Sequence, residues 1–114
     1  MLTQQPMVLS PRGEFDIYSQ SEFAAALNAA DDHPYVVIDF TDVHYLDSTC
    51  ISVLIRMRKR RRSLNFPPVH FAGMRPLLKS VFRITALDHI WPIFDTVEEA
   101  CAAFDDIETG PKGE

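Results

Sequence analysis

The run Asp47-Ser48-Thr49 places two hydroxyl groups directly after an aspartate. The apolar residues before the run predict a strand, and the apolar face of residues 48–62 predicts a helix. The run therefore falls at the first turn of that helix, where free backbone N–H groups and the helix dipole favour an added negative charge. Ser48 is the predicted phosphoacceptor and Asp47 the predicted N-cap. The alternative is that Ser48 and Thr49 are ordinary first-turn residues that only help to cap the helix.

Three carboxylates, Asp39, Asp42 and Asp47, cluster near the end of the preceding strand. They suggest a Mg²⁺ site like that of phospho-aspartate receivers. A receiver also needs an adjacent acidic pair after its first strand and a lysine at the end of a late strand. The pair at 31–32 follows a helix instead, and residues 90–94 contain no lysine. We therefore expect no metal site, and we expect Asp39 to hydrogen-bond nearby backbone; a receiver-like protein remains the second alternative.

The end of the same helix is strongly basic. Six of the chain's eleven basic residues lie between Arg56 and Arg62. No aromatic residues interleave this run and the net charge is −5, so nucleic acid is not a predicted partner. We expect a solvated helix end, which could also meet an acidic partner.

Histidine and cysteine patterns give no catalytic site. Cys50 stands where a helix start lowers thiol pKa values, but no histidine can be assigned as its base. With Cys101 it is expected to be a reduced thiol of a cytoplasmic protein. No glycine-rich phosphate loop is present, so we expect no ATP hydrolysis and no cofactor. The histidines lack metal-ligand spacing; they are His33, His44, His70 and His89.

Strands alternate with helices along the chain, which predicts an α/β fold with a small mixed, largely parallel sheet of four to five strands and about four helices. Residues 42–46 read as a connection, and Ser19 and Thr96 as helix caps within capping boxes. The length of 114 residues fits one domain at 7–104, with tails at 1–6 and 105–114. Strands are expected at 7–9, 14–17, 35–40, 69–72 and 90–94, and helices at 19–30, 48–62, 76–85 and 97–104.

The composition is that of a soluble globular protein, with 46% apolar and 24% charged residues. The first residues lack the basic start and apolar core of a signal peptide. No apolar run approaches the roughly 20 residues that a membrane span needs, so no membrane insertion is expected.

Three segments together resemble the STAS domain of bacterial anti-sigma factor antagonists. Gly13-Glu14-Phe15-Asp16 is similar to the family's early Gly-Glu-apolar-Asp motif. Residues 36–60 are similar to its apolar strand, its Asp-Ser-Ser/Thr-Gly motif and its apolar helix with a basic end. Residues 75–100 are similar to its late helix, short strand and last helix. The resemblance covers roughly residues 7–104.

The resemblance implies a regulatory function. In this family the serine after the aspartate is phosphorylated by a partner serine kinase that doubles as an anti-sigma factor. The unphosphorylated antagonist binds that kinase and so releases sigma factor for transcription, and a serine phosphatase restores it. By position, Ser48 is the acceptor and Thr49 the second choice. The implied partner surface consists of Asp16, Asp47, Ser48, Thr49 and Cys50.

Cys50 departs from the family pattern, which has glycine at this position. We expect the cysteine to add a side chain at the kinase contact, where glycine would allow close backbone approach. The departure favours the alternative function, a STAS adaptor that is never phosphorylated. Such an adaptor would be a stress-signalling scaffold or the soluble subunit of a lipid transporter. The short N-terminal region further predicts a reduced opening hairpin.

Overall fold

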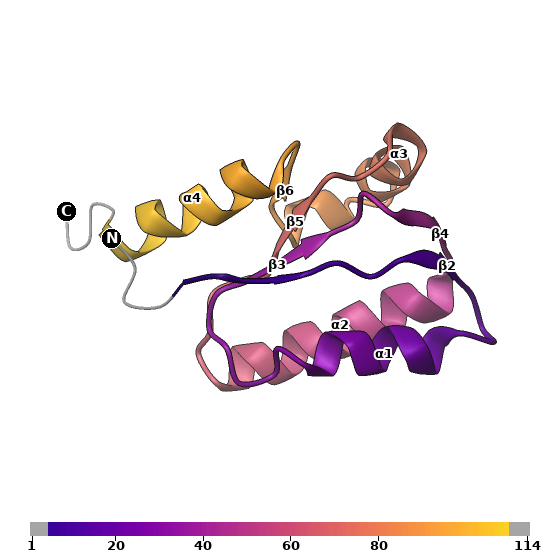
Figure 1. The fold of residues 1–114 in the computed structure, drawn as a ribbon, viewed down its shortest axis with the longest axis horizontal. Helices are drawn as coiled ribbons and strands as arrows, with labels where there is room; N and C mark the ends of the chain where they lie inside the picture. The colour runs from indigo at the N-terminus through magenta and orange to yellow at the C-terminus, as the bar shows by residue number, and fades with distance from the viewer. Residues whose placement is uncertain (1–4, 110–114) are drawn as a thin grey trace.

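The computed structural model describes residues 5–109, with side chains as far as Asp105, and the chain alternates strands and helices as predicted (Figure 1). The strands are β1 (Met7–Leu9), β2 (Gly13–Phe15), β3 (Val36–Asp39), β4 (Val43–Leu46), β5 (His70–Ala72) and β6 (Ile93–Phe94). The helices are α1 (Gln20–Asn28), α2 (Ser48–Ser63), α3 (Pro76–Ile84) and α4 (Val97–Thr109), with a short 3₁₀ helix, η1, at Leu87–His89.

Four strands form the main sheet in the order β1-β3-β5-β6, and each neighbouring pair is parallel. β2 and β4 form a separate two-stranded parallel ladder. β6 is an edge strand, and the proline directly before it fits that position because proline cannot donate a ladder hydrogen bond. The predicted α/β fold with a largely parallel sheet is confirmed, although the strands divide into two ladders.

Alternate side chains of β3 pack on opposite faces of the sheet. Val36 and Ile38 join the larger core cluster with Phe23 of α1 and Leu54 of α2. Val37 joins a smaller cluster beneath α4. Because side chains alternate along a strand, these two sets mark opposite faces. Figure 1 agrees, with α1 and α2 on one side of the sheet and α4 on the other.

α2 forms as its sequence predicts, apart from one extra residue at its C-terminal end. Its buried apolar residues, Cys50, Val53, Leu54 and Met57, recur at the spacing of one helical face. The helix ends at Ser63, where the Leu64 N–H bonds back to the Arg61 carbonyl at 3.1 Å. Packing of this stripe on the sheet fixes where the first turn of α2 lies.

The expectation that residues 42–46 are only a connection is wrong. They contain β4, which pairs with β2. Val43 and Leu46 are buried and the two residues between them are exposed, so the segment lacks the period-2 alternation of a half-buried strand. Its structure depends on a partner strand some 30 residues earlier in the chain, which a local pattern cannot reveal.

The predicted capping box at Ser19 is also wrong, since the Ser19 side chain makes no cap hydrogen bond. Its hydroxyl instead accepts from the Asp16 N–H at 2.9 Å, within the loop before α1. The second box is confirmed in part, because the Thr96 hydroxyl accepts from the Glu99 N–H at 3.1 Å.

The last helix reaches beyond the expected end of the domain. α4 continues past Phe104 to Thr109, so part of the expected 105–114 tail is helical. At the other end, residues 5 and 6 precede β1. The rest of the expected tails, 1–4 and 110–114, lies outside the described residues.

Candidate functional site

The β2–β4 ladder brings two of the predicted site residues to neighbouring strand ends. Phe15 pairs with Leu46, so the next residue of each strand, Asp16 and Asp47, leaves the ladder at the same edge. The Asp47 N–H donates to the Phe15 carbonyl at 3.1 Å, which ties the start of α2 to the end of β2. Residues 31 positions apart in the sequence thus form one local surface.

Asp47 is the N-cap of α2, as predicted. Its extended backbone, with φ −94° and ψ −179°, turns the carboxylate toward the first turn. One carboxylate oxygen, Oδ1, accepts from the Thr49 N–H at 3.0 Å, the Thr49 hydroxyl at 2.6 Å and the Cys50 N–H at 3.2 Å. These bonds, with that from the Thr49 hydroxyl foremost, lower the pKa of Asp47 because they favour the charged carboxylate.

The two candidate hydroxyls have different surroundings. Ser48 is exposed at the first position of α2, and no described residue hydrogen-bonds its hydroxyl. The Thr49 hydroxyl is half-buried and committed to Asp47. Ser48 therefore offers the accessible oxygen, in line with its rank as first choice.

Asp16 also holds the loop before α1 in place beside this surface. Its Oδ1 accepts from the Tyr18 N–H at 2.9 Å and the Ser19 N–H at 3.2 Å. The turn exposes two large apolar side chains, Ile17 at 57% and Tyr18 at 93%. Neither was predicted as a site residue. The sequence does contain a signal for them. Ile17 and Tyr18 are apolar residues between the Asp16 motif and the start of a helix, in a loop that contributes no strand or helix to the core.

Cys50 does not belong to this surface. Its side chain is fully buried, with Sγ 3.9 Å from the Asp16 carbonyl oxygen. The expectation that it adds a side chain at the contact is therefore wrong, because the helix directs Cys50 into the core. Burial raises the pKa of the thiol, which also weighs against a nucleophilic cysteine.

The other carboxylates near this edge have separate partners. Asp39 accepts from the Thr41 N–H at 3.0 Å and the Thr41 hydroxyl at 2.6 Å, so the expected backbone hydrogen bond is present. Asp42 lies 3.8 Å from Arg12. Within the described residues, no group of three or more histidine, cysteine or acidic side chains could hold a metal ion.

The basic end of α2 is only partly solvated. Arg61 is buried at 4% exposure, against the expectation for this run. Its guanidinium donates to the carbonyls of Ala30, His33 and Pro34 at 3.1, 2.7 and 2.9 Å. It thereby holds the loop after α1 against α2, a role set by tertiary packing.

A shallow apolar groove lies between β4 and α3, with a volume of about 210 Å³. Tyr45, Leu77 and Val81 line it and are 53%, 80% and 39% exposed. Leu46, the last residue of β4, also lines the groove and directly precedes the cap of α2. The groove was not predicted, because α3 meets β4 only in the folded chain.

These features, a parallel sheet with a capped Asp-Ser-Thr helix start, match a known family. The family model of the STAS domain covers residues 2–100. The chain belongs to the STAS domain family. Within the described residues, no helix of this STAS domain is long and apolar enough to cross a membrane.

Solved structures share the fold of this STAS domain. An anti-sigma factor antagonist from Mycobacterium paratuberculosis is 24% identical with a TM-score of 0.78, covering 93% of this chain and 91% of its own. The Bacillus cell fate determinant SpoIIAA in its phosphorylated form is 18% identical with a TM-score of 0.61, covering 94% and 95%. A sulfate transporter family protein from Wolinella succinogenes is 12% identical with a TM-score of 0.75, covering 96% and 92%. The fold is thus common to antagonists and to a transporter-family protein.

Proposed function

We propose that this STAS domain is an anti-sigma factor antagonist switched by phosphorylation of Ser48. The unphosphorylated domain binds a serine kinase that is also the anti-sigma factor, and sigma factor is released. Phosphorylation weakens the complex, and a serine phosphatase restores it. The kinase supplies ATP, so the domain is a ligand and substrate in the cytoplasm and no enzyme itself. The observation that carries the proposal is the exposed Ser48 hydroxyl, which has no hydrogen bond to a described residue.

Ser48 suits phosphoryl transfer better than Thr49. A kinase must align the attacking oxygen with the phosphate of its nucleotide, which requires a hydroxyl that can be reached. The Thr49 hydroxyl would first have to leave Asp47, and the new phosphate would then stand beside that carboxylate. Phosphorylation of Thr49 would disrupt the cap, whereas phosphorylation of Ser48 leaves the cap bonds in place.

A phosphate on Ser48 changes the charge of the surface more than the stability of the domain. It adds about −1.5 to −2 charges beside Asp47, near the strand end that carries Asp16. The positive end of the α2 dipole stabilises this negative charge by about 0.3–1 kcal/mol. A kinase surface that fits the unmodified domain must then meet a concentrated negative charge. A hundredfold loss of affinity needs only about 2.7 kcal/mol.

The proposed contact surface consists of Asp16, Ile17, Tyr18, Asp47 and Ser48. Ile17 and Tyr18 supply exposed apolar area, and aromatic residues dominate many interface energies. Thr49 contributes indirectly, by holding Asp47 in place. This set replaces Cys50, whose side chain is buried, with the two apolar residues of the Asp16 loop.

A STAS adaptor that is never phosphorylated is the second candidate. The observation in its favour is that a transporter-family protein has the same fold with a TM-score of 0.75, so the fold alone does not identify the function. The adaptor would belong to a large stress-signalling assembly or to a lipid transporter. Size-exclusion chromatography of the native complex distinguishes the candidates, since only the antagonist forms a small complex with a kinase.

The proposal is tested by incubating the domain with its cognate kinase and ATP and measuring the intact mass. We expect one species heavier by about 80 Da, the mass of one phosphoryl group. Thr49→Ala should still gain this mass, and Ser48→Ala should not. A wild-type domain that stays unmodified, or a Ser48→Ala variant that is still modified, would contradict the proposal.

A further inference from the structure

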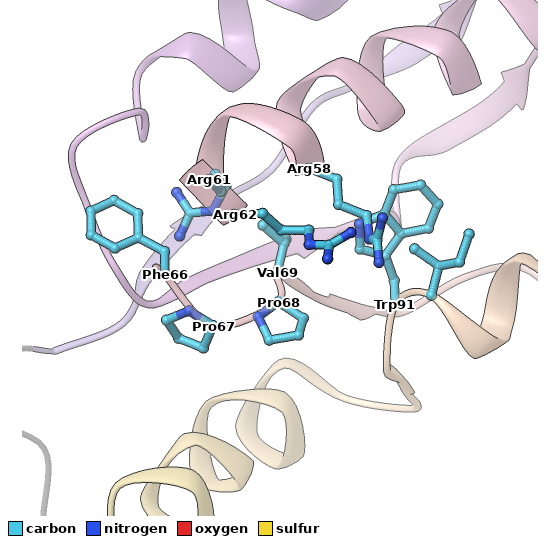
Figure 2. Close-up of a pocket in the computed structure, with 9 residues that line it drawn as sticks. Arg58, Arg61, Arg62, Phe66, Pro67, Pro68, Val69 and Trp91 are labelled. Atoms are coloured by element: carbon cyan, nitrogen blue, oxygen red, sulfur yellow. The ribbon is translucent and has the colours of Figure 1, made fainter. Parts of the chain in front are cut away.

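A cavity of about 280 Å³ lies at the opposite end of α2 from Ser48, some 20 Å away along the helix axis (Figure 2). α2 contributes three arginines to its wall. The loop after α2 and the segment before β6 supply the rest. The lining residues are Arg58, Arg61, Arg62, Phe66, Pro67, Pro68, Val69, Ile90 and Trp91. The wall thus combines cations with apolar side chains, and none of the described residues that line it is acidic.

Arg58 and Arg62 carry charges that the described protein does not neutralise. Neither forms a hydrogen bond or an ion pair with a described residue, whereas the neighbouring Arg60 is 3.3 Å from Asp31. The two arginines are four positions apart, so they lie on one face of the helix and repel each other. The helix C-terminus attracts cations in general. It does not explain why two such groups converge on a cavity in a chain of net charge −5.

Arg61 adds positive potential behind them. Its terminal nitrogens donate to neutral backbone carbonyls, and no carboxylate of the described residues forms an ion pair with it. Its buried Nε–H has no partner among the described residues. Figure 2 shows Arg61 at the Phe66 end of the cavity, with Arg58 and Arg62 extending toward the Trp91 end.

The apolar part of the wall is partly accessible. Pro68 is exposed and Ile90 half-exposed, and both stand in the same cavity as the two free guanidinium groups. The volume is at the lower limit of small-molecule sites, which span roughly 300–1,000 Å³. Such a cavity fits a compact ligand with one anionic and one apolar end.

We propose that this cavity binds a small organic anion. A phosphate or carboxylate group lies between Arg58 and Arg62, and the apolar part of the ligand packs on Pro68 and Ile90. Guanidinium groups suit this role because their planar donors match the paired oxygens of such anions. The bound anion also removes the repulsion between the two arginines. The site lies at the other end of α2 from Ser48 and does not depend on the proposed function.

Phenyl phosphate is a suitable probe, with inorganic phosphate as an anion without an apolar part and benzyl alcohol as a neutral aromatic. Calorimetric titration should give saturable binding of phenyl phosphate that exceeds the affinity for either control. Trp91 is the only tryptophan of the chain and lines the cavity, so its fluorescence should change with the same dissociation constant.

Arg58→Gln and Arg62→Gln should each weaken phenyl phosphate binding by about tenfold, the loss expected for one charge-assisted contact. Arg56→Gln is the matched control, because Arg56 is exposed on the same helix and does not line the cavity. Circular dichroism verifies that all three variants fold. Absence of saturable binding at millimolar concentration would overturn the proposal. Equal weakening by Arg56→Gln, or benzyl alcohol binding as tightly as phenyl phosphate, would do so as well.

Discussion

At the scale of single residues, the difference between Ser48 and Thr49 determines the chemistry of the site. Both are hydroxyl residues in the first turn of α2, and the sequence alone ranks them only by resemblance to the STAS family. Their hydrogen bonds separate them physically. The 2.6 Å bond from Thr49 to Asp47 builds the cap, which leaves Ser48 to face the solvent.

Replacing Ser48 with aspartate should weaken kinase binding more than replacing it with alanine. Both substitutions remove the hydroxyl, but only aspartate adds a negative charge beside Asp47. Surface plasmon resonance with the purified kinase measures the two affinities. Because aspartate carries less charge than phosphate, the effect should be smaller than that of phosphorylation itself. Equal affinities of the two variants would argue against an electrostatic switch.

At the scale of elements, the start of α2 depends on one carboxylate. Asp47→Ala leaves the Thr49 and Cys50 N–H groups without their acceptor, so the variant should unfold at lower temperature than the wild type. Asp42→Ala is the control. Asp42 is exposed, and its ion pair with the exposed Arg12 is long, at 3.8 Å, so its loss should change stability little. Thermal unfolding followed by circular dichroism gives the comparison.

The stability difference between the wild type and Asp47→Ala should depend on pH. The pKa of Asp47 is lowered from its usual 3.8 in the folded protein, mainly by the Thr49 hydroxyl bond. The unfolded chain therefore binds the proton first as the pH falls. The stability difference between wild type and Asp47→Ala should be full above pH 3.8 and shrink below it. A difference that stays constant through acid pH would show that the cap does not depend on charge.

The elements also show where local sequence signals suffice. α2 and its cap could be predicted because apolar spacing and an N-cap residue act within a few positions. β4 could not, because its burial pattern has no strand period and its partner is β2. Likewise, the buried position of Arg61 depends on carbonyls some 30 residues earlier, which α1 brings to the end of α2.

At the scale of the whole molecule, His70 couples stability to pH. It is buried between the sheet and α4, stacked on Phe104 at 3.8 Å, with Nδ1 2.8 Å from the Ala100 carbonyl. Burial lowers the pKa of the imidazole below its usual 6.5. Below that pH the unfolded chain takes up a proton that the folded protein does not, so stability decreases as the pH falls.

We expect the free energy of unfolding to decrease as the pH falls below 6.5, until the folded imidazole itself takes up a proton. His70→Phe should flatten that slope, and His44→Gln, at an exposed position, should not. Urea unfolding at several pH values measures both. An unchanged slope in His70→Phe would assign the pH dependence to other groups.

The position of the first strand and the last helix has a practical consequence for measuring these interactions. β1 begins and α4 ends on the side of the molecule opposite the start of α2 (Figure 1). A tether or fluorophore joined through either end would therefore sit remote from Ser48 and leave the docking face unobstructed. The anion cavity opens at the other end of α2, on the side where β1 begins and α4 ends, so its ligands are better titrated with the protein free in solution.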